Sequence, residues 1–288
     1  MFAVAGVTGH TGRAAAEELL RQGQPVRVIV RETARGDPWK ARGAEVALAS
    51  LDDAAALKRA LIGVRGAYLL LPPVYSAPDL LAAQRKVADA IAATVGESAV
   101  GHVVFLSSIG GQHSTGVGPI RALHEAERVL RGTGKPVTLL RAPYFVENWV
   151  GALPTVREKG VLPSFIALDQ AMEMIATADI GEAAARVLQG AAPSGAKVVE
   201  LGGPAPVTPR EVARRLAGVL GRPVQPVQVP LDEVVPTFTG LGSSRNAAEL
   251  FREMYQAVAS GLLEYEDANA PHLRGGRRPE DVLGPLLA

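Results

Sequence analysis

The stretch Val4-Ala5-Gly6-Val7-Thr8-Gly9-His10-Thr11-Gly12-Arg13 decides the fold of this chain. Its glycines recur at every third position, between a short apolar run, Phe2–Ala5, and an amphipathic pattern over residues 11–21. A tight turn without Cβ atoms lets a pyrophosphate approach the first N–H groups of a helix, whose dipole favours an anion. The stretch therefore predicts a dinucleotide-binding turn made by Gly6, Thr8, Gly9, His10, Thr11 and Gly12.

Short apolar runs and helical patterns alternate through the first half of the chain. Strands are predicted at Phe2–Ala5, Val26–Val30, 45–49, 67–71, 102–106 and 137–141, and helices at 11–21, 53–61, 78–93 and Ile120–Arg131. The strand runs are apolar throughout, which is typical of a parallel sheet covered by helices on both faces. The predicted fold class is α/β, with a doubly wound parallel sheet of the Rossmann type.

The second half predicts a smaller, discontinuous α+β unit. Residues 151–167 favour a loop, Asp179 is predicted to cap a helix over 179–189, and 223–236 favour an extended proline-rich stretch. Thr208 and Glu211 predict a capping box, and a further helix is expected over 249–261. We expect a dinucleotide-binding domain of residues 1–150 and about 195–204, which includes a returning strand at 198–201. A substrate or partner domain is expected from residues 151–194 and 205–288.

Composition excludes several classes of function. The 288 residues carry 30 basic and 29 acidic side chains, a balance that argues against nucleic-acid binding. The chain has no cysteine and only five scattered histidines, so no metal site is predicted. No leader and no apolar run of about 18 residues stands out, so no membrane contact is predicted. We expect a soluble, cytoplasmic monomer or homodimer that acts on a small molecule.

The residue after the second predicted strand bears on cofactor choice. Arg31 follows Val30 directly, and an arginine there suits a 2′-phosphate. Arg35, Lys40 and Arg42 are expected in the same loop region. NADP(H) is therefore the preferred cofactor. NAD(H) stays open as the alternative, because Glu32 offers a carboxylate for the ribose hydroxyls.

Five further segments follow the glycine loop in an order that resembles one family. They are Leu106-Ser107-Ser108, Leu140-Arg141-Ala142-Pro143-Tyr144-Phe145-Val146-Glu147-Asn148, Asp179-Ile180-Gly181, Leu201-Gly202-Gly203-Pro204 with Thr208 and Glu211, and Arg278-Pro279-Glu280-Asp281-Val282-Leu283. Together the segments resemble the NmrA-like family, a branch of the atypical short-chain dehydrogenase/reductase superfamily. The resemblance covers nearly the whole chain. It implies a Rossmann domain and a substrate cleft against a smaller domain.

The resemblance also draws attention to residues beyond the glycine loop. Many relatives carry Gly-Asp-Leu after the third strand, where this chain has Ala49-Ser50-Leu51. The expected further cofactor contacts are Ser50, Leu51, Leu71, Pro72, Ser107, Pro143 and Phe145. The Tyr-x-x-x-Lys pair of typical short-chain dehydrogenases is absent, because its positions hold Pro119 and Leu123. The remaining candidates for catalysis are Ser107, His124 and Tyr144.

Two functions follow from these observations. Without a placed acid, hydride transfer suits an acceptor that stabilises negative charge itself, so the first hypothesis is an NADPH-dependent reductase of a quinone or other activated carbonyl compound. The alternative is a non-catalytic NAD(P)-sensing regulator that acts through a protein partner. A sugar-nucleotide epimerase is disfavoured, since it needs the missing tyrosine and lysine.

Overall fold

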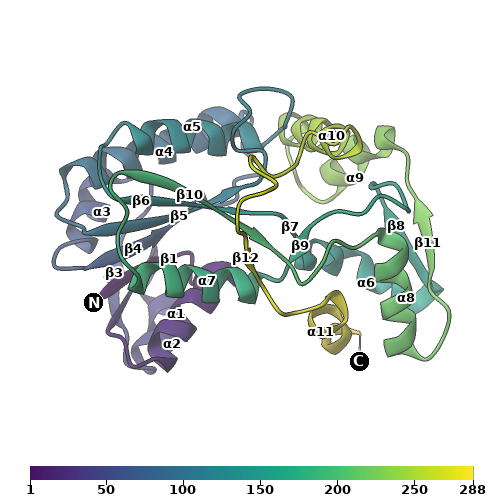
Figure 1. Ribbon diagram of the computed structural model, residues 1–288, viewed down its shortest axis with the longest axis horizontal. Coiled ribbons are helices and arrows are strands. Elements are labelled where there is room, and N and C mark those ends of the chain that lie inside the picture. Colours follow the sequence, from purple (N-terminus) through teal and green to yellow (C-terminus); the bar gives the residue numbers. More distant parts are fainter. Residues whose placement is uncertain (288) are drawn as a thin grey trace.

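A parallel eight-stranded sheet forms the first lobe of the computed structural model, which describes residues 1–287 (Figure 1). Its strands lie in the order β12-β10-β6-β5-β4-β1-β2-β3. Their bounds are β1 (Phe2–Ala5), β2 (Val26–Val30), β3 (Glu45–Leu48), β4 (Gly66–Leu69), β5 (His102–Ser108), β6 (Val137–Ala142), β10 (Ala196–Gly202) and β12 (Leu273–Arg274). Strands β1 to β6 lie in the order β3-β2-β1-β4-β5-β6. This is the order of a dinucleotide-binding Rossmann sheet, which confirms the predicted fold class.

Helices cover both faces of this sheet. One face carries α3 (Ala54–Ala60), α4 (Leu80–Glu97) and α5 (Ile120–Arg131), and the other carries α1 (His10–Arg21), α2 (Thr33–Lys40) and α7 (Thr177–Gln189). Successive strand residues point to opposite faces. In β1, Ala3 and Ala5 therefore enter the core under α3–α5, while Phe2 and Val4 enter the core above α1 and α7. This two-sided burial explains why the strands are apolar throughout.

The second lobe has a separate hydrophobic core. It contains η1 (Val146–Ala152), α6 (Leu153–Lys159), α8 (Pro209–Leu220), η2 (Leu231–Glu233), α9 (Val234–Gly240), α10 (Arg245–Ala259), α11 (Pro279–Leu283) and η3 (Gly284–Leu286). Two small parallel sheets join them, β8 (Val161–Ser164) with β11 (Gln225–Gln228), and β7 (Tyr144–Phe145) with β9 (Met174–Ile175). The core residues fall between Val146 and Leu287 in sequence. Within that range α7, β10 and β12 belong to the first lobe, so the second lobe is discontinuous.

Several local predictions were wrong. Residues 151–167 are not a loop, because they form the end of η1, then α6 and β8. Asp179 does not cap α7, which begins at Thr177 after the N-cap Ala176. The stretch 223–236 is extended only over β11 and then turns into η2 and α9. In these segments structure depends on tertiary pairing, since β8 and β11 are far apart in sequence.

The helix α7 bears on the expected division into domains. We placed residues 151–194 in the smaller domain, but Ile180, Ala184 and Leu188 of α7 are buried in the core beside α1. Glu147 joins the lobes at the start of this helix, since its carboxylate accepts hydrogen bonds from the Thr177 N–H and hydroxyl. The proposed boundary is therefore better drawn with α7 in the dinucleotide-binding domain.

Within residues 1–287, no helix is both long and apolar enough to cross a membrane. The same residues hold no group of three or more histidine or carboxylate side chains placed to bind a metal ion.

Candidate functional site

The turn between β1 and α1 has the geometry that the glycine pattern predicts. Gly6 has φ +72°, which favours glycine, and its carbonyl accepts a hydrogen bond from the Gly9 N–H at 2.9 Å. A Cβ on Gly12 would lie 2.3 Å from the Ala5 carbonyl oxygen, so only glycine lets α1 pack this close to β1. A Cβ on Gly9 would meet only the Gly6 oxygen, at 3.4 Å. Gly9 is the N-cap of α1 and brings no side-chain acceptor to the first N–H groups of the helix. The turn thus fits a pyrophosphate.

The sheet order brings the expected cofactor contacts to one edge. Because every strand is parallel, the residues that follow β1, β2, β3, β4, β5 and β6 all lie at the carboxyl edge of the sheet. The strand order reverses between β1 and β4, and open α/β sheets bind ligands at this point. Leu70, which follows β4, has its Cδ2 atom 2.7 Å from where a Gly6 Cβ would stand. Leu71 and Pro72 come next and are partly buried.

Arg31 and Glu32 are both exposed beyond the end of β2. The following segment is helical, not a loop, so Arg35 and Lys40 are on α2. Arg42 points elsewhere, since its guanidinium pairs with Glu17 at 2.7 Å and lies over the Trp39 ring. Among the four basic residues expected near the cofactor, Arg31 is the one that directly follows β2.

In the turn after β3, an expected cofactor contact, Ser50, forms a hydrogen bond within the turn itself. The Ser50 hydroxyl donates to Asp52 at 2.5 Å, and Leu51 is buried. This hydrogen bond is the largest cause of the lowered pKa of Asp52, ahead of the opposing effect of burial. Asp53 caps α3 by accepting from the Ala56 N–H at 3.0 Å. To donate to a bound cofactor, the Ser50 hydroxyl must turn away from Asp52.

Ser107 belongs to a buried ionic network that its sequence motif did not reveal. Its hydroxyl donates to Glu127 of α5 at 2.6 Å, and Glu127 also binds Arg141 of β6 through two hydrogen bonds of 2.8 Å. All three residues are at most 3% exposed. The Ser107 hydrogen is engaged by a carboxylate, which argues against this residue as the proton donor.

Arg141 extends this network to the C-terminal segment. Its Nη1 donates to Glu266 at 2.6 Å and to Gln112 at 3.3 Å, and it lies 3.7 Å from Glu200. Burial lowers the pKa of the guanidinium, but the charges and hydrogen bonds of Glu127 and Glu266 outweigh this effect and leave the pKa raised. One signal in the sequence pointed here, because an arginine inside an apolar strand needs a buried partner.

His124 is the catalytic candidate on α5, and Pro119 and Leu123 hold the positions of the missing tyrosine and lysine. Pro119 is the N-cap residue of the helix, and Leu123 packs against the core beneath it. His124 places Nδ1 3.0 Å from the Gly111 carbonyl oxygen, which ties α5 to the preceding loop. That loop is covered by α10, since a Cβ on Gly118 would lie 2.0 Å from the Leu250 carbonyl oxygen.

Tyr144 lies where β6 leaves the sheet, between buried Pro143 and partly buried Phe145. Burial, followed by the neighbouring Tyr255 phenol, raises the pKa of Tyr144 well above its usual value. Burial likewise raises the pKa of Tyr255. Both phenols therefore stay protonated near neutral pH, and Tyr255 is a partner that the sequence motifs did not indicate.

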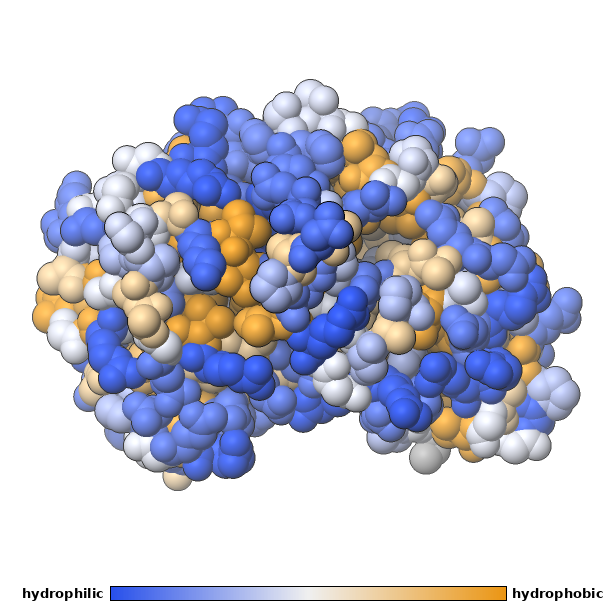
Figure 2. All heavy atoms as spheres, viewed as in Figure 1, coloured by the Kyte–Doolittle hydropathy of each residue, from blue (hydrophilic) through white to orange (hydrophobic). Residues whose placement is uncertain are grey.

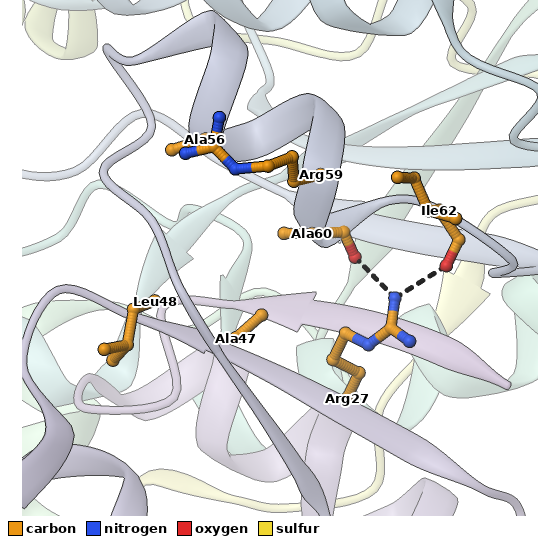
Figure 3. Close-up of a pocket in the computed structure, with 7 residues that line it drawn as sticks. All are labelled: Arg27, Ala47, Leu48, Ala56, Arg59, Ala60 and Ile62. Atoms are coloured by element: carbon orange, nitrogen blue, oxygen red, sulfur yellow. Dashed lines mark hydrogen bonds between the residues drawn. The ribbon is translucent and has the colours of Figure 1, made fainter.

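A shallow pocket of about 380 Å³ lies against the edge strand β3 and is lined by residues of β2 and β3 and of α3 and its C-terminal turn (Figure 3). Arg27 of β2 donates there to the carbonyls of Ala60 and Ile62, at 2.9 and 2.7 Å. These bonds join the end of α3 to the sheet.

The comparisons with known proteins agree with this geometry. The chain is 30% identical over 237 residues to (4-alkanoyl-5-oxo-2,5-dihydrofuran-3-yl)methyl phosphate reductase of Streptomyces griseus, covering 81% of this chain and 78% of the relative. It is 31% identical over 226 residues to quinone oxidoreductase 2 of Escherichia coli, covering 78% and 76%.

A solved structure matches the whole arrangement of elements. The crystal structure of the NADPH-dependent quinone oxidoreductase of Escherichia coli, complexed with NADPH, aligns with a TM-score of 0.79 and 25% identity, over 93% of this chain and 92% of that one. The model of the NmrA-like family matches residues 1–267. With the glycine turn, the strand order and these matches together, the chain belongs to the NmrA-like family.

Proposed function

We propose that this chain is an NADPH-dependent reductase whose acceptor is a quinone or another activated small carbonyl compound. The observation that carries the proposal is the glycine turn at the β1–β4 switch point, whose geometry fits a pyrophosphate, with Arg31 directly after β2. The relatives support it, since they are named as a reductase and an oxidoreductase, and one solved structure is complexed with NADPH. None of these names describes a regulator.

The residues around the site favour an activated acceptor. When bound, the cofactor supplies a hydride, and one proton must also reach the acceptor. A simple ketone becomes a strongly basic alkoxide and needs a placed acid. Pro119 and Leu123 provide none, and Ser107 donates to Glu127. A quinone spreads the charge over its ring, so the neutral phenol of Tyr144 or water suffices.

The test is steady-state oxidation of NADPH with a panel of quinones, activated carbonyl compounds and simple ketones. We expect turnover with quinones and little with ketones. Efficient reduction of simple ketones with quinones inert would contradict the proposal. Tight NADPH binding without turnover of any acceptor would instead favour the regulator that acts through a protein partner.

A further inference from the structure

Aromatic side chains from four separate segments meet in a continuous series of rings. Phe238 of α9 stacks on Phe251 of α10, with centroids 4.4 Å apart and planes at 24°. Tyr75, from the loop after β4, meets Phe251 edge-on at 5.1 Å. Phe165, which follows β8, lies 6.4 Å from Phe238 and 5.2 Å from Tyr255. We call these five residues the aromatic wall.

Four of the five residues of the aromatic wall are partly or largely exposed, and Tyr255, at 8%, is buried. Tyr75 is 43% exposed, and Phe165, Phe238 and Phe251 are only partly buried. Phe2 and Phe105, by contrast, are 1% and 0% exposed. Apolar residues reach the surface over α9 and α10 (Figure 2). Adjacent, partly open aromatic rings are a common feature of ligand-binding sites.

The wall is joined to the phosphate-binding turn by one short loop. Leu70 lies against Gly6, and Tyr75 is five residues further on, a span of at most about 17 Å in an extended chain. The loop is held on the second lobe, because the Tyr75 carbonyl accepts from the Ser244 N–H at 2.8 Å. Asn246 of α10 also accepts from the Leu80 N–H at 3.0 Å. The aromatic wall therefore starts one short loop away from the glycine turn and continues across the second lobe.

We propose that the aromatic wall binds the electron acceptor and selects acceptors with two or more fused or conjugated rings over single-ring quinones. The inference rests on the proposed function and names the substrate class of the same site. Stacked and edge-on ring pairs each add to binding beyond the apolar area they bury. An acceptor with a second ring can stack on a further side chain of the aromatic wall, whereas an acceptor with one ring contacts only part of the wall.

The experiment compares 1,4-naphthoquinone with 1,4-benzoquinone in the unmodified protein and in Phe251→Leu and Phe238→Leu. Leucine keeps an apolar side chain in the second lobe but removes the flat ring. We expect the KM for naphthoquinone to rise about tenfold and that for benzoquinone less than about threefold, because ring stacking is lost mainly for the larger acceptor. The Kd for NADPH should not change. Leu241→Ala is the matched control, since Leu241 follows α9 and is 79% exposed.

Calorimetry with naphthoquinone on the NADP⁺-loaded protein separates this inference from the proposed function. Binding that weakens in the leucine variants supports the wall even when the unmodified protein reduces no quinone. Tyr75→Ala repeats the test at an exposed ring, should a leucine variant fail to fold. Equal changes for the two quinones, or unchanged KM and Kd in folded variants, would overturn the inference.

Discussion

At the residue scale, the glycines of the turn after β1 are not equivalent. A Cβ at Gly12 would lie 2.3 Å from the backbone oxygen of Ala5, whereas a Cβ at Gly9 meets only one atom, at 3.4 Å. We therefore expect Gly9→Val to fold and to lose NADPH binding, because its branches occupy the space of the pyrophosphate. Gly12→Ala should instead lower the thermal unfolding midpoint. Calorimetry and circular dichroism on both variants test the contrast, and unchanged NADPH affinity in Gly9→Val would show that the loop is only a turn.

Arg31 is the residue expected to distinguish the two cofactors. Loss of a charge-assisted contact with the 2′-phosphate costs about 1.5–3 kcal/mol, so Arg31→Ala should reduce the preference for NADPH over NADH by roughly tenfold or more. Arg42→Ala is the control, because Arg42 pairs with Glu17 instead. The measurement is the Kd of each cofactor for each variant. Equal Kd values for NADPH and NADH in the unmodified protein would contradict the assignment.

The pair Glu127–Arg141 should contribute strongly to stability because it is buried. Removing one partner of a buried pair typically costs about 3–5 kcal/mol. Without Glu127, Arg141 keeps Glu266 but loses two buried hydrogen bonds of 2.8 Å, and Ser107 loses its acceptor. Glu127→Ala should therefore destabilise the protein far more than Glu125→Ala. Glu125 is on the same helix and pairs with exposed Arg128 at 3.0 Å, a contact worth at most about 1 kcal/mol. Urea unfolding of the two variants gives the comparison, and similar midpoints would contradict it.

At the element scale, α8 has the clearest start signal in the chain. The Thr208 hydroxyl accepts from the Glu211 N–H at 3.1 Å, and the Glu211 carboxylate accepts from the Thr208 N–H at 2.9 Å. Thr208→Ala should lower the free energy of unfolding by about 1 kcal/mol through loss of the cap. Arg214→Ala, at an exposed position of the same helix, should change it little. Equal unfolding midpoints for Thr208→Ala and the unmodified protein would show that packing alone holds this helix end.

The helix α6 and the start of α7 could not be predicted from the residues close to them in sequence. Pro154 stands in the first turn of α6 and Gly160 ends it with φ +65°, so a helix of seven residues resembles a loop in sequence. The start of α7 was misplaced because Asp179 is a favourable capping residue. Instead, its carboxylate pairs with Arg277, far along the chain. The glycine turn, by contrast, needed only its own residues and their steric limits.

At the scale of the whole molecule, cofactor binding should stabilise both lobes, since Glu147 and α7 link them. A ligand at 100 times its Kd that binds only the folded state adds about 2.7 kcal/mol to stability. NADPH should therefore raise the thermal midpoint of the unmodified protein but not that of Gly9→Val. NADH at equal concentration should raise it less. An equal increase in both proteins would place the stabilising contact outside the glycine turn.

The sequence by itself determined the α/β fold class, the position of the glycine turn and the capping box of α8. These features depend on residues close together in the chain, where apolar periodicity and backbone sterics act locally. Only the tertiary structure decided the partners of Ser107, the pairing of Arg141 with Glu127 and Glu266, and the aromatic wall. Each of these joins residues that are distant in sequence, so their proximity follows from how helices and strands pack and not from any local pattern.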